Sequence, residues 1–303
     1  MTASIGIALA SSTAQSPEAL LQDADTAMYQ AKGRGKGSYQ VFDRQMHVAM
    51  LNRLTLENDL QRALENQEFV LHYQPIMQLD TRQLVGFEAL VRWRHPERGL
   101  VFPDDFIPYM ETTGLIVPVG MMIFKQACQQ LFRWQQSGWE NLTLNVNLSA
   151  RQFADPTLLA EIDQILLDTG VNAAGLKVEI TESALMDNVE MEIALMTALR
   201  SRQIQISIDD FGTGYSSLSY LHRFPIDSLK IDRSFVSQLD APDPSPVVAA
   251  IVALASELGL SLVAEGIETP QQLTKLRQLG CRFGQGFLFD KPLTADEIEQ
   301  TYD

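Results

Sequence analysis

The stretch LKVEITESALMDNVEMEIALMTALRSRQIQISIDD, residues 176–210, decides the fold of this chain. Short apolar runs at Leu176–Ile180 and Ile204–Ile208 are typical of buried strands, and the segment Asn188–Arg202 between them is predicted to be helical. A strand, a helix and a second strand in this order predict two parallel strands joined by a crossover helix.

The same alternation recurs along most of the sequence. We predict eight strands, at Phe69–Leu79, Gln83–Val91, Leu142–Leu148, Leu176–Ile180, Ile204–Ile208, Ser228–Ile231, Ser261–Ala264 and around Arg282–Phe283. We predict helices after the second strand at about Pro103–Trp134, Pro156–Thr169, Asn188–Arg202, Ser216–His222, Ser234–Leu239, Pro246–Leu258 and Gln271–Leu279. About eight such units in roughly 250 residues predict an α/β fold, a (β/α)8 barrel of the TIM type.

One pair of strands departs from this regular barrel. Only the turn Asp80-Thr81-Arg82 separates the first two predicted strands, and a turn of this length cannot carry the crossover that parallel strands require. We therefore expect the first strand to be antiparallel to its neighbour.

The composition limits the classes of function. The 303 residues are 46% hydrophobic and 20% charged, as in ordinary globular proteins. The chain has 23 Lys and Arg against 38 Asp and Glu, and its formal net charge is −15. This charge argues against general DNA or RNA binding, because such proteins need a basic surface to replace phosphate counterions. An anionic substrate would have to be received by a local cluster of cations or by bound metal.

The sequence also indicates the compartment. Cys128 and Cys281 form neither a disulfide framework nor a zinc-binding spacing, which favours a reducing environment. The longest apolar stretch, Gly114–Phe124, is too short for a membrane helix of about 20 residues. The N-terminal MTASIGIALASSTAQS has no Lys or Arg, which a signal peptide needs at its start. We therefore expect a cytoplasmic protein with no membrane segment in this chain.

Polar residues gather at the predicted strand ends, where barrels of this type carry their active sites. These residues are Glu88 and Arg92, Asn145 and Asn147, Glu179 and Glu182, Asp209 and Asp210, Lys230 and Asp232, Glu265 and Glu268, and Gln285. One buried carboxylate is usually structural, but many on one rim repel one another and need compensating charge. All-oxygen ligands favour Mg²⁺ or Mn²⁺, and a pair of such ions activates water and phosphoryl groups. The rim therefore predicts metal-dependent hydrolysis of a phosphoester.

The motifs at these strand ends resemble those of the EAL-domain family, bacterial phosphodiesterases that act on the second messenger cyclic di-GMP. The triplet that names the family is Glu88-Ala89-Leu90, within FEALVRWRHP. The match covers about residues 46 to 300, through NVNLSARQF, KVEITES, IDDFGTGYSSLSYL, LKIDRSFV, VAEGIET and CRFGQGFLF. The resemblance implies hydrolysis of cyclic di-GMP to linear 5′-pGpG by a two-metal mechanism with two Mg²⁺ or Mn²⁺ ions.

The resemblance also implies a role for each residue at the rim. The metal ligands would be Glu88, Asn147, Glu179, Asp209 and Asp210. Lys230 and Glu265 would join Glu88 as catalytic residues, with Glu265 beside the metal-bound water and Lys230 holding or activating that water. The substrate would be bound by Arg92, Asp232 and Gln285. Glu182 would anchor the DDFGTG loop, Glu268 would support the ligands, and Asn145 would be a non-ligand facing the other way along its strand.

The N-terminal part resembles a second family. SIGIALA, followed by SPEALLQDADTAMYQAKGRGKGSYQVFD, resembles the last strand and helix of a GGDEF (diguanylate cyclase) domain. The cyclase signature is absent, so we expect residues 1–43 to be a non-catalytic fragment of a truncated α/β domain. It would hold a strand at Ser4–Leu9 and a helix at about Pro17–Lys32, with another helix at about Asp43–Asn66. We expect the EAL domain at 44–303 and a longer GGDEF–EAL parent protein.

Other readings stay open at this point. Some relatives have lost ligands and serve only as cyclic di-GMP receptors or partner-docking modules, and a complete set of carboxylates argues against that alternative. An unrelated metal-dependent barrel hydrolase would share the rim chemistry but not the ordered motifs. In the EAL family the loop after the fifth strand connects metal binding to a subunit interface, so a homodimer is a further expectation.

Overall fold

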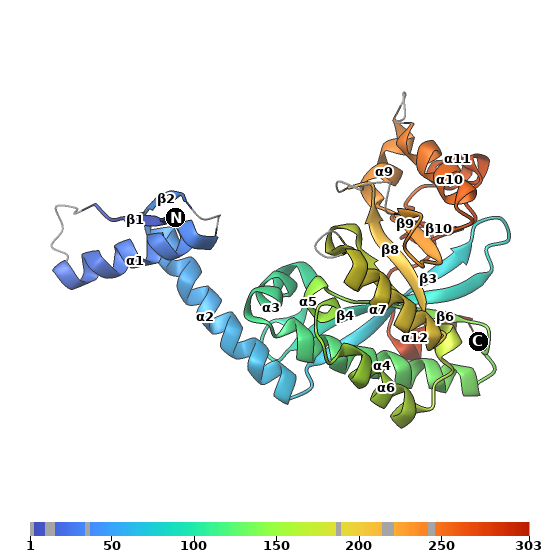
Figure 1. The fold of residues 1–303 in the computed structure, drawn as a ribbon, viewed down its shortest axis with the longest axis horizontal. Coiled ribbons are helices and arrows are strands. Elements are labelled where there is room, and N and C mark those ends of the chain that lie inside the picture. Colours follow the sequence, from blue (N-terminus) through green and yellow to red (C-terminus); the bar gives the residue numbers. More distant parts are fainter. Residues whose placement is uncertain are drawn as a thin grey trace. The chain divides into compact units, whose positions relative to one another are not determined.

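The chain forms two compact units, Met1–Asn66 and Gln67–Asp303. The computed structural model describes residues 3–9, 16–33, 37–185, 189–213, 221–241 and 246–302 (Figure 1). The predicted domain boundary after residue 43 differs in position from the division between the compact units, because the helix at 44–65 belongs to the first unit. The boundary stays a prediction.

The first unit is small and contains the strand and the two helices that were predicted before residue 67. Its elements are β1 (Ile5–Ile7), α1 (Pro17–Gly33), β2 (Tyr39–Val41) and α2 (Arg44–Glu65). β1 and β2 pair in parallel, and β2 was not predicted from the sequence. The side chain of Asp43 accepts a hydrogen bond from the Met46 N–H, so it caps the first turn of α2.

The second unit is a closed barrel. Its eight strands in the described residues are β3 (Phe69–Gln78), β4 (Leu84–His95), β6 (Thr143–Asn147), β7 (Leu176–Thr181), β8 (Gln205–Phe211), β9 (Ser228–Ile231), β10 (Ser261–Ala264) and β11 (Phe283–Gly284). β3 pairs with both β4 and β11, which closes the barrel, and both of these pairings are antiparallel. The other pairings around the barrel are parallel, so the predicted barrel with an inverted first strand is confirmed.

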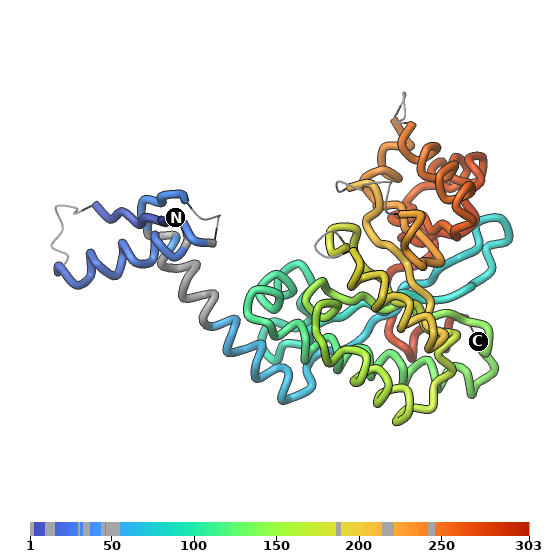
Figure 2. The backbone as a smooth tube through the Cα atoms, in the orientation of Figure 1, coloured from blue at the N-terminus to red at the C-terminus, as the bar shows by residue number. Residues whose placement is uncertain are grey.

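The inverted strand follows from a tight turn. The Arg82 N–H donates to the Gln78 carbonyl at 2.8 Å, and the Gln78 N–H donates to the Gln83 carbonyl at 2.8 Å. Arg82 adopts a left-handed conformation with φ 58°, which reverses the chain within a few residues. β3 and β4 therefore lie side by side as a hairpin, shown in cyan in Figure 2. The short strand β5 (Gly99–Val101) extends this hairpin on the other side of β4.

Helices cover the outside of the barrel (Figure 1). They are α3 (Ile107–Thr113), α4 (Ile116–Gln136), α5 (Ala150–Phe153), α6 (Leu158–Thr169), α7 (Val189–Ser201), α9 (Arg233–Ser237), α10 (Val247–Glu257), α11 (Pro270–Leu279) and α12 (Ala295–Tyr302). Short 3-10 turns occupy Pro103–Asp105, Ala173–Gly175, Glu182–Leu185 and Gln238–Asp240.

Two predicted helices were not found as expected among the described residues. The single helix expected at 103–134 is wrong, because Gly114 has φ 85° and ends α3 before α4 begins. Most of the helix predicted at Ser216–His222 lies outside the described residues, since 214–220 are not among them. None of the described helices is long and apolar enough to cross a membrane.

Aromatic side chains fill the layer between strands and helices. The Phe87 and Trp134 ring centroids are 4.9 Å apart, and those of Phe69 and Trp93 are 5.9 Å apart. All four side chains are buried. Because side chains alternate along a strand, Glu88, the residue after Phe87 on β4, points to the opposite side, into the barrel. This packing fixes the hairpin that carries Glu88.

Candidate active site

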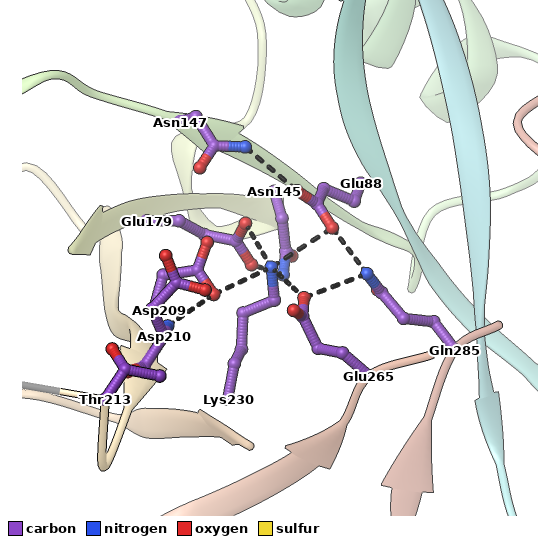
Figure 3. A network of polar contacts seen from close by, with 10 residues as sticks. All are labelled: Glu88, Asn145, Asn147, Glu179, Asp209, Asp210, Thr213, Lys230, Glu265 and Gln285. Atoms are coloured by element: carbon purple, nitrogen blue, oxygen red, sulfur yellow. Dashed lines mark hydrogen bonds and ion pairs between the residues drawn. The ribbon is translucent and has the colours of Figure 1, made fainter. Parts of the chain in front are cut away.

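Lys230 lies at the centre of a cluster of carboxylates inside the barrel (Figure 3). Its Nζ is 2.6 Å from an oxygen of Glu265, 2.8 Å from Glu179, 3.1 Å from Glu88 and 3.3 Å from Asp209. The side chains of Lys230 and Glu179 are completely buried. The strands β4, β7 and β8 and the residue after β10 therefore each bring one carboxylate to the ammonium that β9 carries.

Amide side chains hold these carboxylates in place. Asn147 Nδ2 donates to Glu88 Oε1 at 2.9 Å, and Gln285 Nε2 donates to the other oxygen of Glu88 at 2.5 Å. Gln285 Nε2 also lies 3.1 Å from Glu265 Oε1. Together with Lys230, these amides give the buried Glu88 three donors.

Asn145 belongs to the same cluster, which corrects an expectation. Its Nδ2 donates to Glu179 Oε1 at 2.6 Å, although we expected this side chain to face the other way along β6. The expectation was wrong because Asn145 and Asn147 are two residues apart, and side chains two apart on a strand share a face. This spacing was the signal that sequence reasoning missed.

Strand register explains why distant residues meet. Asn147 lies opposite Glu179 on β7, and Thr181 lies opposite Asp209 on β8. In a parallel barrel, inward-facing residues at matched register form one layer. The sequence places acidic and amide side chains at these inward positions near the strand ends.

The end of β8 is irregular. The ladder between β8 and β9 shifts register between Ile208 and Phe211. Within this bulge Asp210 has φ 54°, a left-handed conformation that is uncommon for residues other than glycine. The Asp210 N–H donates to Asp209 Oδ1 at 2.9 Å. A bulge redirects a side chain that regular pleating would send outward, and here it affects the second of the paired aspartates.

Two of the predicted substrate-binding residues make separate contacts, away from the Lys230 ammonium. Asp232 caps α9 and accepts a hydrogen bond from the Ser234 N–H at 3.1 Å. Arg92 is buried and donates to the Val91 carbonyl at 2.7 Å. Its guanidinium carbon lies 5.2 Å from the centre of the exposed Phe102 ring.

Glu182 and Glu268 differ in their surroundings. Glu182 Oε2 accepts a hydrogen bond from the Gly212 N–H at 2.8 Å, directly after the paired aspartates. Glu268 is exposed, and its backbone N–H donates to the side chain of Gln272. The structure therefore brings Glu182 to the loop after β8 but does not bring Glu268 into the cluster around Lys230.

The crowded charges shift the pKa values of the cluster in both directions. Burial, repulsion by Glu88 and repulsion by Asp209 outweigh Lys230, so the pKa of Glu179 lies well above its ordinary range. Burial would raise the pKa of Glu88, but Lys230 and the amide donors outweigh it and lower that pKa. Burial would lower the pKa of Lys230, but the surrounding carboxylates raise it well above its ordinary value.

Two carboxyl groups are shifted toward neutral pH. Burial, together with the charges of Asp209 and Glu88, raises the pKa of Glu265 to about 8 despite its ion pair with Lys230. Burial and the neighbouring Asp209 and Asp232 raise the pKa of Asp210 to about 6. Both groups therefore hold a proton over part of the physiological range unless further positive charge arrives.

The cluster offers ligand sets for divalent cations. One set consists of Glu88, Glu179 and Asp209, and a second consists of Asp209, Asp210 and Glu265. Within each set, one oxygen of every residue lies within 4.8 Å of the others. Carboxylate oxygens fit the hard cations Mg²⁺ and Mn²⁺. Asp209 belongs to both sets.

Two sequence profiles match the chain. The profile of the EAL domain matches residues 57–292, and that of the diguanylate cyclase GGDEF domain matches residues 1–38. The bifunctional diguanylate cyclase/cyclic di-GMP phosphodiesterase MucR of Pseudomonas aeruginosa is 42% identical over 299 residues, 98% of this chain and 44% of MucR. The cyclic di-GMP phosphodiesterase PdeR of Escherichia coli is 42% identical over 301 residues, 99% of this chain and 45% of PdeR.

Solved structures agree with these matches. The PaMucR phosphodiesterase in complex with c-di-GMP has a TM-score of 0.78 and 43% identity, over 80% of this chain and 99% of that one. The EAL enzyme Bd1971, with cAMP and cyclic di-GMP bound, has a TM-score of 0.81 and 34% identity, over 96% of this chain and 77% of that one. The chain spans less than half the length of the curated relatives MucR and PdeR. Its barrel, its ordered motifs and its profile match over 57–292 show that the chain belongs to the EAL domain family.

Proposed function

We propose that this chain hydrolyses one 3′–5′ phosphodiester of cyclic di-GMP to give linear 5′-pGpG, in a reaction that depends on divalent metal ions. The observation that carries the proposal is the carboxylate cluster around Lys230, which contains Glu88, Glu179, Asp209 and Glu265. The relatives support the choice of substrate, since MucR and PdeR are named as cyclic di-GMP phosphodiesterases. The structure of the PaMucR phosphodiesterase holds the same nucleotide.

The charge of the cluster supports two metal ions. Five carboxylates stand against the single ammonium of Lys230, which leaves four negative charges if all five are ionised. Two divalent cations would balance this charge. The residues that would hold them are Glu88, Asn147, Glu179, Asp209 and Asp210. When bound, Mg²⁺ or Mn²⁺ would polarise the phosphoryl group and lower the pKa of water.

The chain's own residues would divide the remaining work. Arg92 would bind a substrate phosphate, because a guanidinium fork matches two phosphate oxygens. Glu265, which pairs with Lys230 in the cluster, would accept a proton from the attacking water once bound metal has displaced its own proton. Lys230 keeps its charge and would stabilise negative charge that develops on the phosphorus oxygens.

The bond changes follow from this assignment. The water oxygen forms a bond to phosphorus, the bond between phosphorus and the 3′ oxygen breaks, and the leaving oxygen takes up a proton. Gln285 would keep Glu88 and Glu265 in register through its hydrogen bonds to both. Asp232, at the start of α9, would contact the substrate from the rim.

The test is incubation of the purified chain with cyclic di-GMP and Mn²⁺, followed by chromatography. We expect linear 5′-pGpG as the product. Binding of cyclic di-GMP without any product would reject hydrolysis and favour the receptor alternative. A cytoplasmic location and a homodimer stay predictions.

A further inference from the structure

We propose that Asn145 is a positioning residue, whose amide orients Glu179 for metal binding. The inference rests on the proposed metal-dependent function and goes beyond its ligand set. Asn145 is 1% exposed, Glu179 is 0% exposed, and a hydrogen bond of 2.6 Å joins Asn145 Nδ2 to Glu179 Oε1. Figure 3 shows the Asn145 side chain within the cluster, with its amide reaching Glu179.

The two oxygens of Glu179 have different donors. Oε1 accepts from Asn145, and Oε2 accepts from Lys230 at 2.8 Å. A carboxylate held at one oxygen can still rotate about its last side-chain bond, whereas donors on both oxygens fix its plane. The Asn145 bond therefore determines the direction in which Glu179 presents its oxygens.

A comparison with Glu88 shows why the loss of the Asn145 amide should have a larger effect than the loss of the Asn147 amide. Glu88 has three donors, Asn147, Gln285 and Lys230, so the loss of one leaves two. Among the described residues Glu179 has a single amide donor, and its loss would leave a buried carboxylate oxygen with no hydrogen bond from this part of the chain. Asn147 is exposed near the open end of β6, whereas Asn145 lies deeper in the barrel.

The remaining atom of the amide points to the same conclusion. Asn145 Oδ1 is buried and has no hydrogen-bond partner in the described part of the chain. When Glu179 is ionised, as a metal ligand is, the opposite orientation would place this oxygen 2.6 Å from the carboxylate, where two acceptors repel. An amide that leaves its own carbonyl unsatisfied in the interior is unfavourable unless its donor is needed. The hydrogen bond from Asn145 Nδ2 to Glu179 explains why the amide keeps this orientation.

The experiment measures Mn²⁺ binding by calorimetry in the full chain, because this readout does not require turnover. Asn145→Leu keeps the approximate side-chain size and removes the donor. Asn145→Asp removes the donor and adds a charge next to Glu179. The matched control is Asn141→Asp, at an exposed asparagine before the same strand, which changes the net charge equally. Thermal melting of every variant verifies folding.

We expect both Asn145 variants to bind Mn²⁺ about 10- to 100-fold more weakly than the wild type, as is typical when a residue behind a metal ligand is lost. The kcat for cyclic di-GMP should fall while KM changes little, because Arg92 is untouched. Asn145→Ser, which keeps a hydroxyl donor, should recover part of the Mn²⁺ affinity. A purely structural role would instead lower the melting temperature and leave the Mn²⁺ affinity of the folded variant unchanged.

Three results would overturn the inference. They are wild-type Mn²⁺ affinity in a folded Asn145→Leu chain, equal weakening in the Asn141→Asp control, and a wild-type chain that binds no Mn²⁺. If Asn145→Leu does not fold, Asn145→Ser and Asn145→Asp carry the same comparison. Mn²⁺ binding without hydrolysis by the wild type would reject the proposed function alone, since the affinities still test Asn145.

Discussion

At the scale of single residues, the site is a problem of charge balance. Lys230 is completely buried and lies within 3.3 Å of four carboxylates, so its ammonium stabilises groups that would otherwise repel one another. A buried charge needs such partners, since removal of one partner leaves an uncompensated charge in the interior. Substitutions in this cluster should therefore change metal binding and catalysis together.

Glu88→Ala should abolish hydrolysis. Glu88 belongs to one of the two ligand sets and accepts hydrogen bonds from three side chains, so its loss removes a ligand and releases its donors. We expect Mn²⁺ affinity and pGpG formation to fall together, measured by calorimetry and chromatography. The matched control is Glu257→Ala, at the exposed last residue of α10. This substitution should leave Mn²⁺ affinity and pGpG formation unchanged. Near-normal turnover by Glu88→Ala would remove this residue from the ligand set.

Lys230→Ala should lower kcat far more than it changes the KM for cyclic di-GMP. A group that stabilises charge mainly in the transition state contributes to rate rather than to ground-state binding, and the loss of one such donor typically lowers kcat by about 10²- to 10³-fold. Steady-state kinetics at saturating Mn²⁺ measure the two constants. An increase in KM with unchanged kcat would show that Lys230 serves substrate binding instead.

Metal affinity should rise with pH between about 6 and 8. The pKa of Glu265 is raised to about 8 and that of Asp210 to about 6, so both carboxyls are protonated below these values in the metal-free protein. A metal ion must displace these protons, and each released proton increases affinity by about tenfold per pH unit. Above pH 8 the dependence should flatten.

The measurement is calorimetry of Mn²⁺ binding in buffers with different ionisation enthalpies. This comparison counts the protons released. Glu265→Gln should release fewer protons than the wild type at pH 7. An affinity that is independent of pH from 6 to 8 would contradict the proposed participation of these two carboxyl groups.

At the scale of elements, the turn after β11 places Gln285 and leaves no space for a side chain. Gly286 has φ 155°, and a Cβ there would lie 2.2 Å from the Ile267 backbone nitrogen. Gly286→Ala should therefore destabilise the fold by more than about 3 kcal/mol, in the range of severe packing substitutions. It should also displace Gln285 and reduce activity.

A second glycine provides the matched control for backbone strain alone. Gly259 has φ 67°, and no atom of the residues that the structure describes lies within 4 Å of a Cβ built there. Gly259→Ala should cost only about 1–2 kcal/mol, the usual penalty for a left-handed conformation. Chemical denaturation of the two variants measures the difference. Equal stability losses would show that the close approach at Gly286 has no energetic consequence.

The helices and strands show which features of the fold can be predicted from the sequence. Strand positions and the inverted hairpin follow from apolar runs and from the short turn at Asp80-Thr81-Arg82, because these signals are local. The break between α3 and α4 was missed, since it depends on the left-handed conformation of a single glycine, Gly114. β2 was missed because its three residues, Tyr39–Val41, stand outside any longer apolar run, whereas the equally short β1 lies within the apolar run Ser4–Leu9.

The active site can likewise be predicted from the sequence only in part. Strand-end carboxylates are visible in the sequence, and the structure brings Glu88, Glu179, Asp209 and Glu265 to one ammonium. The sequence does not reveal which amide serves which carboxylate, because that depends on register between strands. The exposed position of Glu268 likewise depends on how the chain turns after β10.

At the scale of the whole molecule, the first unit exposes several large apolar residues. The first unit exposes Ile5, Leu9, Leu21 and Tyr39, with between 55% and 75% of each residue accessible. Exposed apolar residues of this kind are typical of surfaces that bind other protein segments. The first unit contains none of the residues assigned to the active site.

A chain that begins at Arg44 should therefore keep its kcat for cyclic di-GMP and self-associate less than the full chain. Such a chain retains α2 and the complete barrel unit. Light scattering measures association, and steady-state kinetics measure kcat. Loss of hydrolysis in a folded 44–303 chain would show that the N-terminal fragment contributes to the active site.

The most direct test of the central claim is the metal dependence of cyclic di-GMP hydrolysis by the full chain. The purified protein is incubated with cyclic di-GMP and Mg²⁺, Mn²⁺ or a chelator, and chromatography follows the formation of linear 5′-pGpG. We predict product with Mg²⁺ or Mn²⁺, none with chelator, and recovery of activity when the metal is restored. Product formation that persists in chelator, or intact substrate under every condition, would contradict the account.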